Sequence, residues 1–447
     1  MISRKLLKTV RFYETEQWNV KYFLTTEIAS EFPINDIGKH VIHITKKTKL
    51  FDQPDKEFKI LGISNEKGMF DAYTEFGKNI NQPYIYVENG CLAYNPYRIN
   101  VGSIGLKTDE LVNEYISPAY VVFKCKETLL PEYLYFILKT AVFKTLIQDN
   151  TTGSVRQTLS YDKLAKIKIP IPPIDTQLIL INKYKNKLQK VKKMEEDITV
   201  LEKKSDEYLL SSLGVSIENI DQSKGTLIRP FRLKSLSRWD AWTQTNKYTL
   251  SKYQFSKFSS VVIGKPLYGA NEKTVKSKSD IRYIRITDIN EDGSLGDDFV
   301  SAKKTEEKYL LQENDFLIAR SGNTVGKTFL YKKYFGKCIF AGYLVRYKLN
   351  TQKIIPEYLL YYTQSSLFKT WIQNNQRIFG QPNINGQEYL NADIVIPDIT
   401  KQAEIAKYIG ELYDKMARKK SEIKDATLYA QTQFEEAVFG ETQEIKN

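Results

Sequence analysis

The sequence feature that most constrains the fold is a long helical pattern over residues 177–213, which follows a proline-rich stretch at residues 169–173. A narrow apolar stripe runs through this pattern, interrupted only at Ser205, and consists of Ile181, Tyr184, Leu188, Val191, Met194, Ile198, Leu201 and Tyr208. Steps of three, four and seven residues on an otherwise polar helix are typical of a coiled coil. At about 1.5 Å per residue the helix would be roughly 55 Å long, and its stripe needs a partner helix.

A second helical pattern, at residues 402–440, can supply this partner. Its apolar stripe consists of Ile405, Ile409, Leu412, Met416, Ile423, Ala426, Ala430 and Ala437. Both patterns begin with the same motif, in which Ile171, Pro172, Ile174 and Gln177 match Ile396, Pro397, Ile399 and Gln402 at one constant difference in residue number, here called the repeat offset. We therefore expect two long helices that cover each other's apolar stripes.

The same repeat offset extends upstream of the helices. Residues 130–177 and 355–402 align without a gap and are identical at 15 of 48 positions. Further upstream, Tyr84, Glu88, Asn89 and Leu92 match Tyr309, Glu313, Asn314 and Leu317. A repeat of this length indicates duplication of a whole unit and not a solenoid of short repeats.

The repeat predicts the order of the domains along the chain. We expect a globular domain at residues 1–170, a long helix at 171–214, a connector at 215–235, a second globular domain at 236–395 and a second long helix at 396–440. Gly214 is a good stop signal for the first helix.

Short apolar runs and helical spacing occur together in both globular domains. The pattern predicts strands at residues 41–44, 84–87, 120–123 and 282–289, a strand–turn–strand at 315–331, and a helix at 131–148. The predicted fold class is therefore α+β.

Composition narrows the class of partner. The 447 residues include 66 Lys or Arg against 53 Asp or Glu, which gives a formal net charge of +13, and they include 30 Tyr and 22 Phe. This charge predicts an anionic partner, and the aromatic side chains suit base stacking or buried interfaces. A merely basic soluble protein is the alternative.

Cysteine usage and hydropathy point to a cytoplasmic protein. Cys91, Cys125 and Cys338 lie far apart without a CxxC motif, which argues against a disulfide framework or a zinc site. No apolar run approaches membrane-spanning length, and the first residues lack the apolar segment of a secretory signal.

Residues 321–328 differ by one residue from a phosphate-binding P-loop, because Ser321 replaces the first glycine. A P-loop must lead into a helix whose N-terminus faces the phosphates, whereas residues 329–334 predict a strand. The matching stretch of the first repeat, residues 99–105, has neither the lysine nor the threonine. A turn that presents side chains is therefore the favoured interpretation.

Other motifs give equally little support for catalysis. Asn95-Pro96-Tyr97 lacks one proline of the adenine methyltransferase tetrapeptide, and Glu306-Glu-Lys308 has no paired aspartate on an upstream strand. His40 and His43 lie three residues apart in a predicted strand, without a cysteine or matched carboxylate nearby. We expect neither catalytic residues, nor a metal site, nor a bound cofactor.

The combination of repeat, proline-rich turn and long helix resembles the specificity subunit of type I restriction–modification systems. The resemblance covers almost the whole chain and rests on residues 169–177 and 394–409, together with RQTLSYDKL and GQPNINGQEYL before them. One departure is that Thr176 and Lys401 stand where a glutamate often precedes the glutamine. This departure affects helix capping and the fit of a partner.

The resemblance implies a non-catalytic subunit with two similar target-recognition domains, each reading one half of a split sequence in double-stranded DNA. It implies that the two long helices form an antiparallel coiled coil, which sets the spacing between the half-sites and docks methyltransferase (modification) subunits. A translocating restriction subunit would then be recruited. No membrane partner is implied.

Loops that present Arg, Lys, Asn and Gln can distinguish base pairs in the major groove. The candidate DNA-binding residues are Tyr94, Arg98, Asn100, Ser103, Arg156 and Gln157 in the first domain, and Arg320, Asn323, Lys327, Arg377, Gln381 and Asn383 in the second. Other Lys and Arg residues would bind phosphates and set the register.

Several alternatives stay open. A run of six lysines on the first long helix is either a solvated face or a contact with DNA phosphates or an acidic partner: Lys183, Lys185, Lys187, Lys190, Lys192 and Lys193. The chain as a whole could serve another type of restriction–modification system, occur as an orphan copy, or act as a coiled-coil scaffold that binds protein alone.

Overall fold

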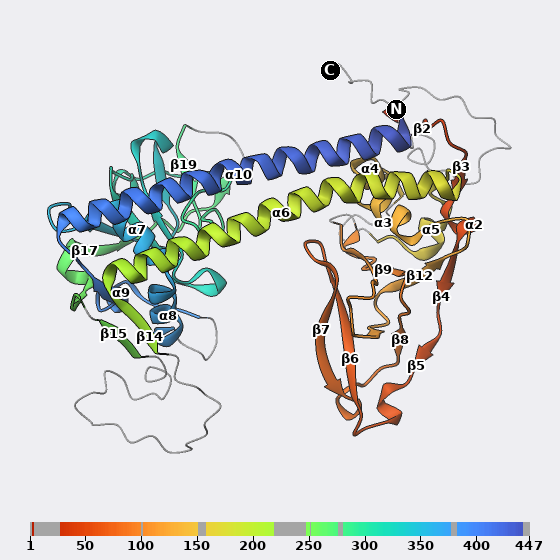
Figure 1. Ribbon diagram of the computed structural model, residues 1–447, viewed down its shortest axis with the longest axis horizontal. Helices are drawn as coiled ribbons and strands as arrows, with labels where there is room; N and C mark the ends of the chain where they lie inside the picture. The colour runs from red at the N-terminus through yellow and green to blue at the C-terminus, as the bar shows by residue number, and fades with distance from the viewer. Residues whose placement is uncertain are drawn as a thin grey trace. The chain divides into compact units, whose positions relative to one another are not determined.

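The computed structural model describes residues 2–3, 27–99, 102–150, 158–218, 247–250, 252–275, 280–376 and 382–440. The chain divides into two compact units (Figure 1). Unit 1 consists of Met1–Met194 and Ser421–Asn447, and unit 2 consists of Glu195–Lys420. Each unit therefore contains the globular part of one repeat and pieces of both long helices.

Each unit contains a four-stranded antiparallel sheet, and the strand order is the same in both units. In unit 1 its order is β10 (Ile104–Leu106), β9 (Cys91–Tyr94), β12 (Val121–Cys125) and β4 (Val41–Ile44). In unit 2 the matching order is β22 (Thr328–Leu330), β21 (Asp315–Ala319), β24 (Leu344–Leu349) and β17 (Val262–Tyr268). The common order confirms that the duplication inferred from the sequence is also a duplication of structure.

The helical part of each unit follows the same plan. Unit 1 has α3 (Pro131–Lys139), α4 (Ala141–Asn150), α5 (Tyr161–Lys166) and β13 (Lys168–Pro170); unit 2 has α7 (Pro356–Gln364), α8 (Ser366–Asn375), α9 (Gly386–Leu390) and β25 (Asp393–Val395). The first residues of all four pairs are related by the repeat offset. Strand β13 pairs with β3 (Ile34–Asp36), which α2 (Ile37–His40) follows, and β25 pairs with β16 (Phe255–Lys257).

Residues 131–148 are helical as predicted, but they form two helices, because the backbone turns at Thr140 (ψ 156°) between α3 and α4. The Thr140 hydroxyl donates to the Ile137 carbonyl at 2.6 Å and accepts from the Phe143 N–H at 3.1 Å. These bonds end one helix and cap the next. Ser365 makes the same pair of bonds between α7 and α8.

The units differ in the additional strands that lie, in the sequence, between the strands of the four-stranded sheet. Unit 1 has a second sheet, which extends away from α3–α5 in Figure 1, in the order β5 (Lys47–Thr48), β8 (Tyr84–Tyr86), β11 (Tyr115–Ile116), β6 (Glu57–Ser64) and β7 (Gly68–Phe76). Unit 2 has only short pairs here in its described part, β18 (Thr274–Val275) with β20 (Ser301–Ala302) and β19 (Arg282–Ile284) with β23 (Cys338–Phe340).

The strand predicted at residues 282–289 therefore ends early, at Ile284. The Asp288 carboxylate accepts a hydrogen bond from the Arg285 N–H at 2.8 Å and pairs with the Arg285 guanidinium, and this folds the chain into a turn. Two further strand pairs are β1 (Ile2–Ser3) with β2 (Glu27–Ile28) and β14 (Val215–Glu218) with β15 (Lys247–Leu250). Strand β14 occupies the start of the predicted connector.

The long helices are α6 (Ile174–Leu213) and α10 (Ile399–Phe439). Each ends at a glycine with left-handed backbone, Gly214 (φ 64°) or Gly440 (φ 81°). No helix in the described ranges is long and apolar enough to span a membrane.

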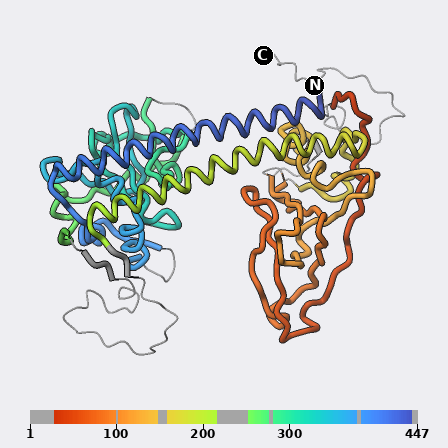
Figure 2. Tube along the Cα trace, viewed as in Figure 1, coloured from red at the N-terminus to blue at the C-terminus, as the bar shows by residue number. Residues whose placement is uncertain are grey.

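The helices run antiparallel within each unit (Figure 2). In unit 2, Asp197 pairs with Lys419 at 2.8 Å, while Tyr208 further along α6 lies 3.9 Å from the ring of Tyr408, which comes earlier on α10. Most stripe residues are buried or half-buried as predicted. Ala437 is exposed, so its predicted place on the stripe is wrong, and the neighbouring Phe434 and Val438 enter the core instead. Lys185 bonds Glu132 at 2.6 Å, so the lysine run is not wholly solvated.

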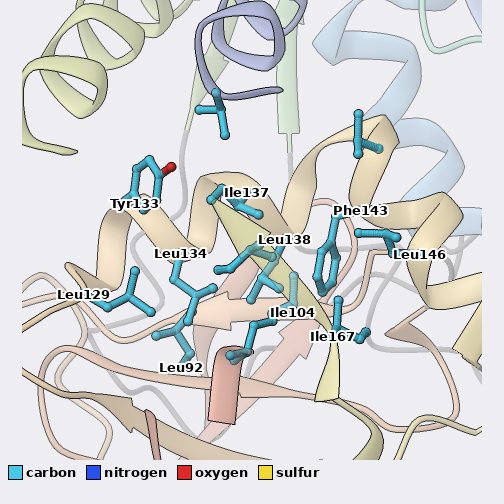
Figure 3. Packing of buried hydrophobic residues seen from close by; sticks show 14 of the residues in the cluster. Leu92, Ile104, Leu129, Tyr133, Leu134, Ile137, Leu138, Phe143, Leu146 and Ile167 are labelled. Carbon is cyan, nitrogen blue, oxygen red and sulfur yellow. The ribbon is translucent and has the colours of Figure 1, made fainter. Parts of the chain in front are cut away.

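The core of each unit includes the end of the other repeat's helix. In unit 1 the helices α3 and α4 cover the sheet with Leu134, Ile137, Leu138 and Phe143 (Figure 3), and α10 adds Ala430, Phe434, Val438 and Phe439. In unit 2, Leu209 and Leu213 of α6 join Ile405 and Ile409 of α10. Burying one such large apolar side chain contributes about 1.5–3 kcal/mol, so the helix ends are integral to both cores.

A fully buried glutamine fastens each long helix to its domain. The Gln177 amide accepts from the Leu130 N–H at 2.8 Å and donates to the carbonyls of Thr128 (3.1 Å) and Pro172 (2.8 Å). Gln402 repeats all three bonds in unit 2, with Ile355, Lys353 and Pro397 as partners. A glutamine amide suits this position because one backbone N–H needs an acceptor and two backbone carbonyls need a donor.

Replacing Gln177 by alanine should lower the free energy of unfolding of unit 1 by about 2–4 kcal/mol, since buried backbone groups lose their partners. Hydrogen exchange over Pro131–Lys139 measures the effect. Gln402→Ala should act in the same way on Pro356–Gln364 and leave α3 unchanged. Gln189→Ala, further along α6 and away from this junction, is the control; an equal effect from it would contradict this role for the buried amide.

Candidate nucleic-acid interface

In unit 1 the loop after β9 is built on a buried tyrosine. Tyr94 is 0% exposed, its hydroxyl donates to the Leu159 carbonyl at 3.1 Å, and burial raises its pKa. Ser103, at the other end of the loop, is 3% exposed. Both side chains are internal supports of the loop, and their burial argues against the expectation that they contact DNA.

The tip of this loop is exposed. The Asn95 N–H donates to the Ser103 carbonyl at 3.1 Å and closes the loop, and the Asn95 side chain accepts from the Tyr97 N–H at 3.0 Å. Arg98 and Tyr97 (59% exposed) therefore project from a folded turn. Lys139 also stabilises the loop, because its ammonium donates to the Gly102 carbonyl at 3.1 Å. Burial, and then the nearby Lys144, lower the pKa of Lys139.

In unit 2 the structure joins two loops that lie far apart in the sequence. The Gly322 N–H donates to the Pro382 carbonyl at 2.9 Å, and the Ile384 N–H donates to the Arg320 carbonyl at 3.0 Å. These bonds bring Arg320, Asn323 and Asn383 to one surface. Asn323 is exposed and the other two are half-buried. The remaining candidates, Asn100, Arg156, Gln157, Arg377 and Gln381, lie outside the described residues.

Arg320 is held by an aromatic ring that the sequence analysis did not identify. Its guanidinium carbon lies 5.0 Å from the centre of the Tyr268 ring, and its backbone N–H donates to the Tyr343 carbonyl at 2.9 Å. The Tyr268 hydroxyl accepts from the Gly386 N–H at 2.9 Å, which fixes the ring. A stacked guanidinium keeps its planar edge available for a bidentate acceptor. Tyr343 itself is 54% exposed beside it.

Lys327 is a weaker candidate than its sequence suggested. Its ammonium donates to the Ile289 carbonyl at 3.2 Å and pairs with Glu291 at 3.0 Å, and its side chain is only 19% exposed. A contact with DNA would have to replace these internal bonds. Residues 328–330 form strand β22, which confirms the prediction of a strand after the P-loop-like turn; residues 333–335 form a 3₁₀ turn.

In both units a tyrosine hydroxyl and a backbone carbonyl form a hydrogen bond at the base of the loops. The Tyr94 hydroxyl of unit 1 bonds the Leu159 carbonyl, and in unit 2 the Tyr389 hydroxyl bonds the Ala319 carbonyl at 2.8 Å. Ala319 is the counterpart of Tyr94 at the repeat offset. The end of β9 therefore supplies the tyrosine of this hydrogen bond in unit 1, whereas the end of β21 supplies its carbonyl in unit 2. The same offset places Arg320 opposite Asn95, and Asn323 opposite Arg98. Equivalent frameworks thus present arginine and asparagine in exchanged positions.

The histidine and cysteine side chains of the described residues make internal contacts or lie free. No group of three or more His, Cys, Asp or Glu in these ranges could hold a metal ion. The His40 ring bonds the Thr128 hydroxyl at 2.7 Å, His43 stacks on Tyr161, and burial lowers the pKa of both histidines. Cys91, Cys125 and Cys338 are free thiols that form no disulfide.

Residues 251–426 match the family model for the type I restriction modification DNA specificity domain. The chain is 21% identical over 294 residues to the specificity subunit of the type I restriction enzyme StySPI from Salmonella potsdam, covering 63% of this chain and 58% of that protein. It is 23% identical over 284 residues to the EcoBI specificity subunit from Escherichia coli, covering 61% of this chain and 56% of that protein. The matches thus span less than two thirds of these relatives.

Among solved structures, the S subunit of a type I restriction–modification system from M. genitalium aligns with a TM-score of 0.41 and 13% identity, over 92% of this chain and 97% of that one. The chain is thus similar to specificity subunits of type I restriction enzymes, and residues 251–426 match the DNA specificity domain of these systems.

Proposed function

We propose that this chain is the sequence-specific DNA-binding subunit of a type I restriction–modification enzyme, and that each globular domain reads one half of a bipartite target. The observation that carries the proposal is the loop junction built twice on one framework, with arginine and asparagine exchanged between the units. Arginine suits guanine and asparagine suits adenine in the major groove, so the two halves would read different bases.

The proposal assigns the remaining roles to partners. The chain itself would be non-catalytic, and methyltransferase subunits would dock on the coiled coil. A translocating restriction subunit would complete the assembly in the cytoplasm. The antiparallel pairing seen within each unit supports a role for α6 and α10 in setting the spacer between the half-sites.

Binding to DNA is tested by mobility shifts on duplexes that contain the target, at salt concentrations from about 50 to about 200 mM. A reader with several phosphate contacts loses affinity about a thousandfold or more over this range. Binding should be lost in this way and should be specific for one split sequence. A coiled-coil scaffold for proteins would bind none of the duplexes, and that result would end the proposal.

Replacing Arg320 by alanine should weaken DNA binding by about 1–3 kcal/mol and relax the preference at one base pair, if its stacked guanidinium reads that base. Arg320→Lys keeps the charge but loses the planar fork, so it should relax the preference almost as much. Arg98→Ala should do the same in the other half-site. Selection from a randomised library measures both effects. Uniform weakening on all sequences would identify a phosphate contact instead.

Removing one heptad from within residues 181–208, with its partner segment within 405–437, should shorten the preferred spacer by about one to three base pairs. A heptad adds about 10 Å of helix, and DNA rises about 3.4 Å per base pair. Deleting three or five residues instead breaks the apolar stripe and should reduce stability first. The readout is methylation mapping on a library of spacer lengths. A folded heptad variant with an unchanged spacer would show that the helices do not set the distance.

A further inference from the structure

Helices α4 and α8 occupy matching places in the two units and make an unusual contact at their first residue. The Ala141 N–H, at the start of α4, donates to the Glu435 carboxylate at 2.6 Å. The Ser366 N–H, at the start of α8, donates to the Asp206 carboxylate at 2.8 Å. Ala141 and Ser366 are counterparts at the repeat offset. In each case the carboxylate comes from the long helix of the other repeat.

The chemistry of a helix start explains why carboxylates lie here. The first N–H groups of a helix have no partner within it, and the helix dipole favours a negative charge beside them. Thr140 and Ser365 already accept from the third residues, Phe143 and Phe368. The first N–H of each helix is not satisfied by this cap, and it takes its acceptor from a long helix.

The two carboxylates are not counterparts in the repeat. The repeat offset places Gln431, and not Glu435, opposite Asp206, so the acceptor lies one helical turn further along α10 than inheritance alone would put it. Leu210 is the residue opposite Glu435. The same contact is therefore made in both units by carboxylates at positions that are not counterparts.

Helix α8 packs directly on the candidate loop of unit 2, and α4 is linked to the candidate loop of unit 1 through α3. In unit 2, Gly326 of the loop with Arg320 (φ 88°) packs so closely on Ile372 of α8 that an added Cβ would lie 2.8 Å from that side chain. In unit 1 the link passes through α3: Lys139, its last residue, donates to the Gly102 carbonyl of the loop with Arg98, and Thr140 bonds both α3 and α4. A shift of α8 would therefore act on its loop directly, and a shift of α4 would act on its loop through the Thr140 turn.

We propose that Glu435 and Asp206 are positioning residues, which orient α4 and α8 on the long helices and so aim the loops that carry Arg98 and Arg320. Each recognition domain is then aligned by a carboxylate that the other repeat provides. This inference rests on the proposed function and adds the residues that orient the two DNA-binding loops. Neither carboxylate contacts DNA in this scheme.

The test uses the full chain and selection from a library of duplexes in which both half-sites are varied. Asp206→Ala should reduce affinity about two- to thirtyfold, the usual range for a lost helix cap, with the loss of discrimination confined to the half-site read by unit 2. Glu435→Ala should do the same for the half-site read by unit 1. Asp206→Asn and Glu435→Gln keep an acceptor oxygen and should recover most of the discrimination.

Glu207→Ala on α6 and Glu422→Ala on α10 are matched controls, because both carboxylates lie on the long helices and neither is at a helix start. If either alanine variant fails to fold, Asp206→Glu and Glu435→Asp replace it, since they keep the charge and change the reach by one methylene. Asp206→Glu should reduce discrimination only at the half-site read by unit 2, and Glu435→Asp only at the half-site read by unit 1.

Three results would overturn the inference while leaving the proposed function intact. They are unchanged discrimination in Asp206→Ala and Glu435→Ala, an equal loss at both half-sites from either variant, and an equal loss from the controls. Failure of the unmodified chain to bind any bipartite duplex would instead overturn the proposed function itself.

Discussion

The structure depends first on the buried amides of Gln177 and Gln402. Each ties the first turn of a long helix to the backbone just before α3 or α7, through one accepted and two donated hydrogen bonds. A buried polar group is tolerated only when its bonds are complete, and here they are completed by the proline-rich turn and the strand–helix connection. The direction in which the helix leaves its domain is fixed by these bonds.

Because the helices pair antiparallel, the end of each one lies against the domain of the other repeat. Phe434 and Val438 enter the core of unit 1, and Leu209 and Leu213 enter that of unit 2. The compact units therefore do not coincide with the repeats, although the sequence suggests two self-contained halves. Each globular domain is thus completed and capped by the long helix of the other repeat.

The long helices, the repeat and the stop at Gly214 were predictable, because they follow from residue spacing and residue type in the sequence. The break at Thr140 was not, since a threonine within an apolar helical pattern shows no sign of its two backbone bonds. Tyr94 looked like a surface residue of a polar loop and is a core support. Tyr268 and Tyr343 could not be found, because only the pairing of β17 with β24, and of β24 with β21, brings them beside Arg320.

The central claim is that two domains on one framework direct methylation to one split sequence. Comparing the methylated motifs of the source strain with those of a strain lacking this gene tests it most directly. We predict that deletion abolishes methylation at a single bipartite motif, in both halves together, and that the intact gene restores it. Identical methylation patterns in the two strains would contradict the account.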